Sequence, residues 1–264
     1  MTAGSTDGTW RVLADDGGRD APRNLALDEA LARTAGPVPT LRLWRNGPCV
    51  VLGRFQVAAA EVDARACREL GVPVYRRFTG GGAVYQDPGN LNVTIALRRD
   101  DPRLAGRADL SGLPGLYRLV LQPLAAAARS FGPAAVAAER DLMVGGTKLG
   151  GAAAWIGSET LLVHGTLLVD ADLATLEAVL DGPGAPGDAR WERTRSRRSP
   201  VTSLAREAGG TGTPGLDPAT VDAAVVAAVT HGAGRSGSVS EDEAAMADRL
   251  MQARYARQSW HEHG

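Results

Sequence analysis

Gly145-Gly146-Thr147-Lys148-Leu149-Gly150-Gly151-Ala152-Ala153-Ala154 contains the only lysine in a chain of 264 residues that has 28 arginines. An ammonium is a compact point charge with three rotatable donors, whereas a guanidinium is a planar fork, so the two differ where one charge must reach oxygens on different groups. A lone lysine among arginines therefore indicates chemistry, although a solvated loop charge is the ordinary alternative. The flanking glycines permit tight turns and close approach of a ligand to the backbone. We call residues 145–154 the lysine loop.

Composition limits the class of protein. At 264 residues with a 44% hydrophobic fraction, the chain is long enough for one large domain. We expect a flexible N-terminal segment at residues 1–23 and a single domain at residues 24–264. A net charge of -1 argues against a nucleic-acid partner. No apolar run approaches a membrane span and no signal peptide begins the chain, so we predict a cytoplasmic protein without a membrane partner.

The two cysteines, Cys49 and Cys67, provide neither a disulfide framework nor a metal-ligand cluster. Both lie among apolar or helical residues, which favours buried, inert thiols. We therefore predict no metal bound by a dedicated set of side chains.

A second glycine-rich element is Arg76-Arg77-Phe78-Thr79-Gly80-Gly81-Gly82-Ala83-Val84-Tyr85. It lies between strands expected at residues 72–77 and 93–97, and a turn is expected at residues 87–90. Consecutive glycines cost backbone entropy, so such a tract indicates that something lies against bare backbone. Its amides, with Arg77 beside them, suit a phosphate or carboxylate. The phosphate loop of nucleotide hydrolases is excluded because no Gly-Lys-Ser or Gly-Lys-Thr follows.

Periodicity and capping signals predict strands at residues 10–13, 41–44, 50–52, 141–144 and 160–169, helices at 62–70 and 113–131, and further helices capped by Asn24, Asp170, Asp217 and Ser240. The strand at 160–169 is expected to be interrupted at His164 and Gly165. His164 is either a satisfied core residue or a functional one. Helix dipole and solvation explain Asp28 and Glu29 more simply than catalysis does.

Three other features have ordinary explanations. His231 is explained by a helix C-terminus, and His261 and His263 look incidental in the tail. The arginines at positions 190, 193, 195, 197 and 198 form either a solvated face or a docking surface for an acidic partner.

From about Asn24 to its end, the chain resembles the lipoate-protein ligase family, in the superfamily shared with biotin ligases and octanoyltransferases. The specific blocks are residues 76–91, Lys148 with its glycines, and His164-Gly165-Thr166-Leu167-Leu168. Weaker matches are residues 24–30, 53–56 and 198–204. Several ordered blocks at family-like spacing are more specific than any one alone.

The resemblance implies a mixed α/β (α+β) catalytic domain whose central sheet is largely antiparallel, flanked by helices and related to class II synthetase cores. It implies that lipoate or octanoate reacts with ATP and Mg²⁺ to give an acyl-adenylate. The acyl group then passes to a lysine of a lipoyl-carrier domain, either an E2 subunit of a 2-oxoacid dehydrogenase or the glycine cleavage H protein.

The resemblance also implies roles for individual residues. Lys148 would be catalytic, bridging the α-phosphate and the acyl carbonyl. ATP and the acyl-adenylate would be bound by Arg77, Gly81, Gly82, Ala83, Val84, Tyr85, Asp141 and Lys148, and the acyl pocket would be lined by His164, Gly165 and Gly151. The lysine loop would be mobile and close over the adenylate to exclude water.

The chain departs from the family pattern in several places. Gln86 stands where histidine is common, Gly150 and Ala152 where serines are common, and Trp155 and Ile156 where basic residues are common. Polar contacts to the adenylate and the acyl preference are therefore expected to differ. No small accessory domain follows the expected catalytic domain, so a separate accessory subunit is one possible partner.

Three other functions compete with ligation. An octanoyltransferase moves the acyl group between carriers without ATP and uses a cysteine, but none follows Cys67. Biotin ligation is disfavoured because the glycine-arginine repeat of that branch does not occur. A non-catalytic protein that binds an acyl-adenylate or carrier domain is favoured by the missing serines and disfavoured by the retained lysine.

Overall fold

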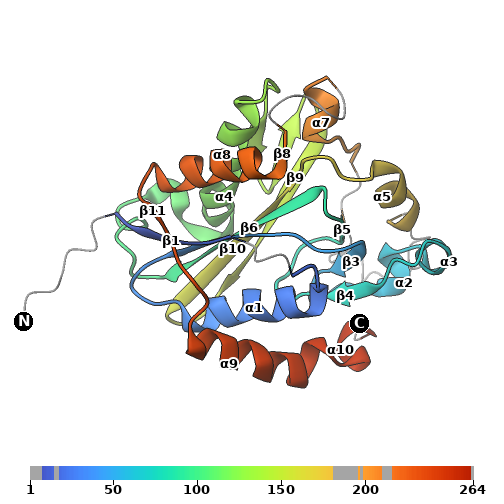
Figure 1. Ribbon diagram of the computed structural model, residues 1–264, viewed down its shortest axis with the longest axis horizontal. Helices are drawn as coiled ribbons and strands as arrows, with labels where there is room; N and C mark the ends of the chain where they lie inside the picture. The colour runs from blue at the N-terminus through green and yellow to red at the C-terminus, as the bar shows by residue number, and fades with distance from the viewer. Residues whose placement is uncertain (1–7, 15–17, 181–195, 197–198, 210–215, 263–264) are drawn as a thin grey trace, which may run out of the picture.

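A sheet of eight strands runs through the middle of the molecule (Figure 1). The computed structural model describes residues 8–14, 18–180, 196, 199–209 and 216–262. The strand order is β11 (Gly234–Ser236), β1 (Trp10–Ala14), β2 (Thr40–Trp44), β6 (Asn90–Arg98), β10 (Thr160–Leu168), β9 (Thr147–Ile156), β8 (Asp141–Val144), β7 (Val136–Ala138). Only the pairings of β1, with β11 and with β2, are parallel. The predicted mixed fold with a largely antiparallel sheet is therefore confirmed.

A smaller sheet of three strands lies beside one end of the large sheet (Figure 1). Its central strand β3 (Cys49–Leu52) pairs in parallel with β4 (Val74–Arg76) and antiparallel with β5 (Val84–Gln86). The expected strands near residues 50–52 and 72–77 thus form, but in this separate sheet. The glycine-rich loop, residues 77–83, connects β4 to β5.

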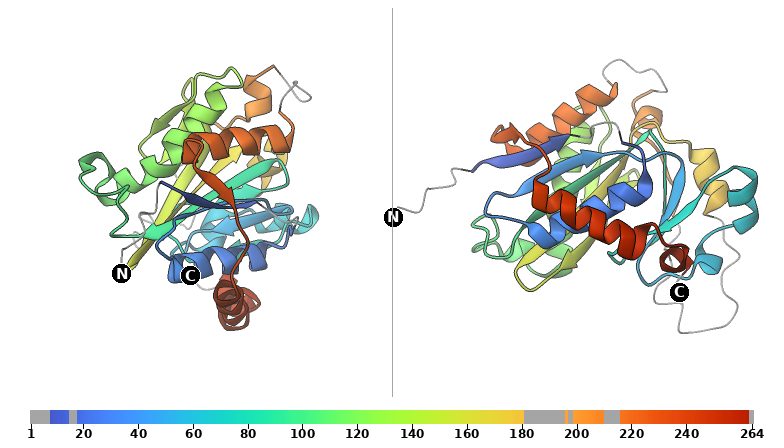
Figure 2. Two further views of the ribbon diagram at one scale, coloured as in Figure 1. Left: turned by 60° about the vertical axis from the view of Figure 1, so that its left-hand side comes forward. Right: turned by 60° about the horizontal axis from the view of Figure 1, so that its bottom comes forward.

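Helices cover both faces of the large sheet. On one side lie α4 (Gly112–Arg129) and α8 (Pro218–Thr230), and on the other lies α1 (Ala21–Thr34) with α9 (Glu241–Leu250) outside it (Figures 1 and 2). The other helical segments among the described residues are α2 (Ala58–Glu61), α3 (Ala64–Glu69), a 3₁₀ helix (Ala108–Leu110), α5 (Leu173–Val179), α7 (Leu204–Glu207), a π-helical turn (Met251–Tyr255) and α10 (Gln258–Glu262). None of the helices in the described ranges is long and apolar enough to span a bilayer.

The two faces of the large sheet differ in chemistry because side chains alternate along each strand. We call the face under α4 and α8 the apolar face; β2, β6 and β10 present to it Leu41, Leu43, Leu91, Val93, Ile95, Leu161, Val163 and Leu167, all in one core with leucines and valines of the two helices. The opposite face, here the polar face, carries Arg42, Trp44, Asn92, Thr94, His164 and Thr166 from the same three strands. Burial of apolar area stabilises the first face, whereas the second needs hydrogen bonds.

The structure corrects the predicted N-terminal boundary. The strand predicted at residues 10–13 forms as β1 between β11 and β2 and Trp10 is buried, so this part of the segment expected to be flexible belongs to the large sheet. Helix α1 begins at Ala21 with Asp20 at the N-cap position, not at Asn24. Pro22 suits the first turn, where its missing N–H is not needed. The side chain of Asn24 instead donates to Gly18, Arg45 and Asn46.

Two further boundaries differ from expectation. Strand β10 continues through His164 and Gly165 without interruption. Glycine gives α4 room there, because a Cβ at Gly165 would lie 3.1 Å from side-chain atoms of Leu124 and Val120, which would have to shift by a few tenths of an ångström. Helix α5 is capped by Asp172, whose carboxylate accepts from Thr175 N, and not by Asp170.

Other local predictions are confirmed. Asp217 caps α8, which ends at His231 in the left-handed region (φ 49°) followed by Gly232. Ser240 and Glu243 form the predicted capping box of α9. Cys49 and Cys67 are buried, and desolvation raises the pKa of Cys49 to about 12. The arginines at 190, 193, 195, 197 and 198 and His263 lie outside the described residues.

Candidate functional site

The predicted lysine loop is a β-hairpin. Gly145 and Gly146 form the turn between β8 and β9 with φ of 53° and 86°, a left-handed pair that suits a two-residue hairpin connection. Lys148 is the second residue of β9, so residues 147–154 form a strand and not the predicted loop. The later glycines serve close packing instead, since a Cβ at Gly150 would lie 2.0 Å from Thr166 O.

The backbone of Lys148 also forms hydrogen bonds with residues 200–202, which lie outside the strands. Its N–H donates to Pro200 O (2.8 Å), and its carbonyl accepts from Thr202 N (2.9 Å). Val201 forms a parallel bridge with it. The backbone of Lys148 is therefore held by β8 on one side and by residues 200–202 on the other, and only its side chain is free to move.

The Lys148 ammonium forms an ion pair with Asp141, with Nζ 2.7 Å from Oδ1. A Cβ at Gly151 would lie 3.1 Å from that Nζ and 3.3 Å from that Oδ1, so glycine makes room for the pair. Both side chains keep about a quarter of their surface exposed, 27% and 26%. A partly solvated pair of this kind can exchange partners when an anion arrives.

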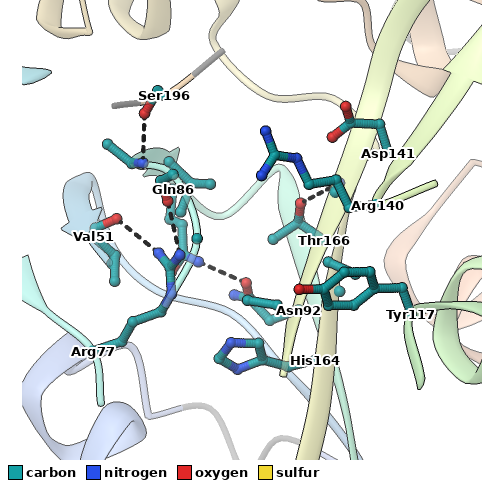
Figure 3. A pocket seen from close by; sticks show the side chains of 18 of the residues that line it. Val51, Arg77, Gln86, Asn92, Tyr117, Arg140, Asp141, His164, Thr166 and Ser196 are labelled. Atoms are coloured by element: carbon teal, nitrogen blue, oxygen red, sulfur yellow. Dashed lines mark hydrogen bonds between the residues drawn. The ribbon is translucent and has the colours of Figure 1, made fainter. Parts of the chain in front are cut away.

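Two cavities meet at Lys148. The inner pocket, about 110 Å³, lies over the polar face and is lined by Leu25, Trp44, Asn92, Tyr117, Arg140, Asp141, His164 and the glycine-rich loop, among others (Figure 3). The outer pocket, about 370 Å³, is lined by residues including Glu61, Tyr85, Asn90, Leu168, Leu176, Leu180 and Val201. Lys148, Ala83, Val84, Thr166 and Ser196 line both.

Arg77 is buried beneath the glycine-rich loop. Its guanidinium donates to the carbonyls of Val51 (3.2 Å), Gly80 (2.6 Å) and Gly82 (2.8 Å) and to Thr79 Oγ1 (3.0 Å). Burial lowers its pKa to about 10, so it stays charged at neutral pH. Arg77 lines the inner pocket, but most of its donors are used to fix the loop backbone.

Ser196 accepts a hydrogen bond from one of the backbone amides that were predicted from the sequence to bind phosphate. Its Oγ accepts from Ala83 N (2.8 Å) and from Gln56 Nε2 (3.1 Å), while its N–H donates to the Glu61 carboxylate. Gly82 must be glycine for this contact, because a Cβ there would lie 2.9 Å from the same Oγ. An anion at Ala83 N would have to displace the serine hydroxyl.

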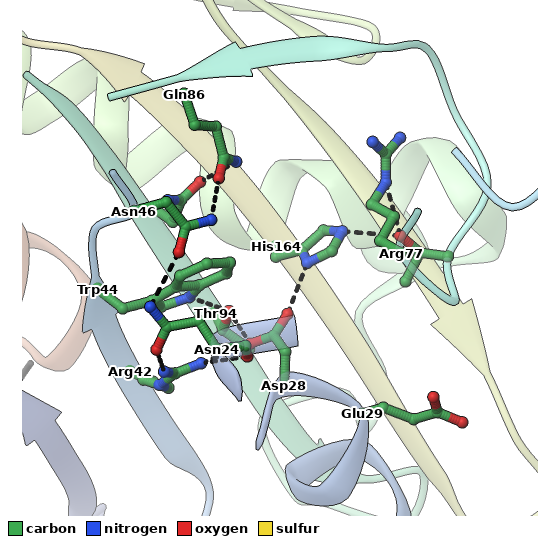
Figure 4. A network of polar contacts seen from close by, with 12 residues as sticks. Asn24, Asp28, Glu29, Arg42, Trp44, Asn46, Arg77, Gln86, Thr94 and His164 are labelled. Atoms are coloured by element: carbon green, nitrogen blue, oxygen red, sulfur yellow. Dashed lines mark hydrogen bonds and ion pairs between the residues drawn. The ribbon is translucent and has the colours of Figure 1, made fainter. Parts of the chain in front are cut away.

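His164 is the centre of a hydrogen-bonded row on the polar face. Its Nδ1 lies 2.7 Å from Asp28 Oδ2 and its Nε2 lies 2.9 Å from Thr79 Oγ1 (Figure 4). Because a carboxylate only accepts, Nδ1–H donates to Asp28 Oδ2, and in the neutral imidazole Nε2 then accepts from the O–H of Thr79, whose oxygen also accepts from Arg77. The order resembles a hydroxyl-His-Asp triad. However, Thr79 is 1% exposed and lines neither pocket, so the row positions the loop.

The solvated-carboxylate interpretation of α1 is wrong. Asp28 and Glu29 are 1% and 0% exposed and lie in the middle of the helix, beyond the first turn. Asp28 also accepts from Thr94 (2.6 Å). Glu29 accepts from Tyr255 Oη (2.8 Å) and pairs with Arg33 and Arg254. Apart from Arg33, which is four residues from Glu29, the partners of the two carboxylates lie far away in the sequence, where single-sequence periodicity does not detect them.

His261 is also not incidental. It is buried, its Nδ1 accepts from Arg76 N (3.1 Å), and its Nε2 lies 2.9 Å from Tyr255 O, which fixes the neutral tautomer with Nε2–H. Desolvation lowers its pKa. Arg76 donates in turn to the carbonyls of Trp260 and His261 in α10 and to Gly53 O and Gln56 O.

The structure brings most of the predicted residues together. The inner pocket is lined by Arg77, Gly81, Gly82, Ala83, Val84, Asp141, Lys148, Gly151, His164 and Gly165, and Tyr85 lines only the outer pocket. Sequence reasoning missed Tyr117, Asn92, Arg140 and Ser196. The polar alternation at Asn90, Asn92 and Thr94 in an otherwise apolar strand was the available signal for Asn92.

The profile of the lipoyl protein ligase A/B catalytic domain matches residues 20–230. The chain belongs to this family. Lipoate-protein ligase A subunit 1 of Thermoplasma acidophilum is 34% identical over 186 residues, which cover 69% of this chain and 71% of that protein. Octanoyltransferase LipM of Symbiobacterium thermophilum is 32% identical, covering 95% of this chain and 97% of the relative.

Solved structures agree with this family. A bi-partite lipoate protein ligase of T. acidophilum, studied with its E2 lipoyl domain, has a TM-score of 0.77 at 27% identity and covers 96% of both chains. A lipoate-protein ligase A bound with ATP gives the same TM-score and identity, covering 96% of this chain and 98% of the other. Some relatives are longer: the chain spans 46% of the length of lipoate-protein ligase LplJ of Bacillus subtilis.

Proposed function

We propose that the protein is a lipoate-protein ligase that uses ATP to convert lipoate to lipoyl-AMP and then transfers the lipoyl group to a lysine of a lipoyl-carrier domain. The observation that carries the proposal is the position of Lys148, whose side chain lines both pockets. An acyl chain in one pocket and a nucleotide in the other would bring their reacting groups together at this ammonium.

The chemistry of each pocket supports this assignment. The inner pocket has Leu25, Trp44 and Val51 for an acyl chain. The outer pocket is larger, and it contains Asn90, whose buried Oδ1 accepts no hydrogen bond from any described residue. An exocyclic amine, as on adenine, is a donor that fits such an acceptor. The ATP-bound relative, similar over 98% of its length, is consistent with a nucleotide site in this fold.

Magnesium would enter with the nucleotide. The described residues contain no group of three His, Cys, Asp or Glu side chains that could hold a metal ion. Mg²⁺ commonly keeps several waters and binds through substrate phosphates plus one or two carboxylates. Asp141, beside Lys148, and Glu61 and Glu177, which line the outer pocket, are carboxylates positioned to contribute.

Lys148 would act in both half-reactions. In the first, a lipoate carboxylate oxygen attacks the α-phosphorus and pyrophosphate leaves, while the ammonium contacts oxygens of both groups and offsets their negative charge. In the second, the neutral amine of the acceptor lysine attacks the acyl carbonyl and AMP leaves. Asp141 would hold the ammonium in position between turnovers.

Partners follow from the same proposal. The relative with TM-score 0.77 is bi-partite and was solved as part of a lipoylation system with an E2 lipoyl domain. We therefore propose lipoyl domains of E2 subunits, or the glycine cleavage H protein, as acceptors and a separate accessory chain as a possible subunit. Action in the cytoplasm, without membrane or nucleic-acid partners, stays a prediction.

Octanoyl transfer without ATP is the second candidate, because LipM of S. thermophilum matches nearly the whole chain. As expected from the family resemblance, octanoyltransferases use a cysteine thiol for this transfer. Here the only two cysteines are buried, and neither lines the inner or the outer pocket. Burial also raises the pKa of both thiols, which opposes thiolate formation.

Exchange of labelled pyrophosphate into ATP tests the proposal directly. Lipoate, octanoate and biotin are compared with the purified chain, alone and with an accessory subunit. We expect exchange that requires lipoate or octanoate and no exchange with biotin. Octanoyl transfer from one carrier to another in the absence of ATP, without any exchange, would establish the transferase instead. Tight binding of lipoyl-adenylate with neither reaction would indicate a non-catalytic relative.

A further inference from the structure

A row of side-chain amides crosses the polar face and ends at the inner pocket (Figure 4). Asn24 Nδ2 donates to Asn46 Oδ1 (2.9 Å), Asn46 Nδ2 donates to Gln86 Oε1 (2.6 Å), and Gln86 Nε2 donates to Asn92 Oδ1 (2.7 Å). All four side chains are buried. Each amide can in principle be turned around, so the direction of the row needs a fixed end.

Arg42 supplies that fixed end. Its guanidinium donates to Asn24 Oδ1 (2.6 Å) and cannot accept. Asn24 must therefore present its oxygen to Arg42 and its nitrogen to Asn46, and the same orientation passes to Gln86 and Asn92. The direction follows from an obligate donor and does not depend on distinguishing nitrogen from oxygen.

The row consequently ends in a donor. Asn92 Oδ1 accepts from Gln86 and from Asn90 Nδ2 (3.2 Å), so Nδ2 takes no part in the row. This nitrogen is buried and donates to no acceptor among the described residues, and Asn92 is 2% exposed. Asn92 lines the inner pocket, where its amide lies between Gln86, Tyr117 and His164 (Figure 3). A buried donor without an acceptor is costly and is usually matched by a ligand or water.

The distance between Asn92 and Lys148 indicates which part of a bound acid could reach the Asn92 donor. Asn92 on β6 pairs with Thr166 on β10, and Thr166 Oγ1 accepts from Gly151 N on β9, the residue over which the Lys148 side chain lies. Two strand spacings therefore separate Asn92 from the lysine, about 10 Å. An extended eight-carbon acid, with bonds of roughly 1.5 Å, is close to this length. With its carboxylate at Lys148, its far end reaches Asn92.

We propose that Asn92 is a specificity-determining residue whose Nδ2 donates to an acceptor atom near the far end of the acyl chain. The pocket then selects a medium-chain acid that has a heteroatom in its tail over a plain hydrocarbon of equal length. This inference rests on the proposed function, since it takes the carboxylate to lie at Lys148. The ring sulfurs of lipoate are weak acceptors, and a ketone oxygen is a stronger one.

Binding of three acids to the full chain tests the proposal by titration calorimetry. Octanoate has no tail acceptor, lipoate has sulfur and 7-oxooctanoate has oxygen. One added hydrogen bond corresponds to about a tenfold difference in Kd, so we expect 7-oxooctanoate to bind about tenfold tighter than octanoate, with lipoate between them. Equal binding of the three, or tightest binding of octanoate, would overturn the role of Asn92. No binding of any acid would instead refute the proposed function.

Two variants separate the donor from the fold. Asn92→Asp keeps the oxygen that accepts from Gln86 and Asn90 and removes the donor. Gln86→Glu can no longer donate to Asn92, so the Asn92 amide turns and presents its oxygen to the pocket. Both should abolish the preference for 7-oxooctanoate, read as the ratio of its Kd to that of octanoate in the same variant. A retained preference in either folded variant, checked by its melting curve, would contradict the proposal.

Discussion

The two faces of the large sheet are built from the same strands but hold together by different means. On the apolar face, leucines and valines of β2, β6 and β10 pack against α4 and α8. On the polar face, two rows of hydrogen bonds cross the strands: one ends at the Asp28 carboxylate and the other at Asn92. The comparison teaches that one face can supply stability, so that the other can keep buried polar groups for chemistry.

Lys148→Ala is expected to show the largest difference between its effect on activity and its effect on stability. Removing a charge that stabilises a transition state should lower lipoate-dependent pyrophosphate exchange roughly a thousandfold. The melting temperature should hardly change, because the side chain is 27% exposed and its single ion pair is partly solvated. Arg65→Ala, which breaks the exposed Arg65–Glu69 pair, is the control and should change neither quantity. A Lys148→Ala protein with parental exchange would remove the basis of the proposed function.

Leu124→Ala on the apolar face is expected to do the reverse, lowering stability and leaving activity almost unchanged. This fully buried leucine of α4 packs over Gly165, and its truncation should cost about 3 kcal/mol of unfolding free energy, read from urea denaturation. Activity per folded molecule should stay near the parental value. Adding Gly165→Ala places a methyl group in the space created and should recover part of the loss. If Leu124→Ala leaves stability intact, the assignment of stability to this face is wrong.

A smaller effect is expected from Thr79→Val, which removes the hydroxyl between Arg77 and His164 and keeps the shape. Two buried groups then lose a partner, so we expect a loss of about 2 kcal/mol and a raised KM for ATP, because the glycine-rich loop is less well held. Thr220→Val, at the exposed start of α8, is the matched control and should cost less than about 0.5 kcal/mol. Equal effects of the two substitutions would mean that the row on the polar face contributes little.

The smallest effect is a pH dependence carried by His261. Desolvation lowers its folded pKa below the ordinary 6.5, so the unfolded chain binds the proton more readily. Stability is fully present above pH 6.5 and falls as the pH drops below it, by at most about 1.4 kcal/mol per pH unit. In His261→Asn, the side chain can still accept from Arg76 N, and the slope of unfolding free energy between pH 6.5 and 5.5 should become shallower. An unchanged slope would assign the effect to other groups.

Sequence predicted what depends on local pattern or on composition. The single lysine and the triple glycine were recognisable because their residue types are unusual, and the structure brings both to one pocket. The caps of α8 and α9 follow short-range rules and were confirmed. Residues 145–154 were predicted to be one loop, because sequence does not distinguish a glycine needed for left-handed φ, as at 145 and 146, from one needed for close packing, as at 150.

Sequence analysis failed mainly to predict which charged side chains are buried. Asp28, Glu29 and His261 looked solvated or incidental because each is matched by residues far along the chain: Thr94 and His164 for Asp28, and Arg254 and Tyr255 for Glu29. Asn92 was missed for the same reason, since the row that orients it begins 68 positions earlier at Asn24. Long-range pairing of polar groups becomes visible only when the strands are placed side by side.

The link between Arg76 and α10 connects the far end of the described chain to the glycine-rich loop of the inner pocket. Arg76 holds the carbonyls of Trp260 and His261 with the same guanidinium that fixes Gly53 O and Gln56 O, and its neighbour Arg77 anchors the glycine-rich loop. Trimming by a carboxypeptidase past residue 260 would leave this guanidinium with fewer acceptors. Catalysis would then decline while the cores around α4 and α8 remained folded.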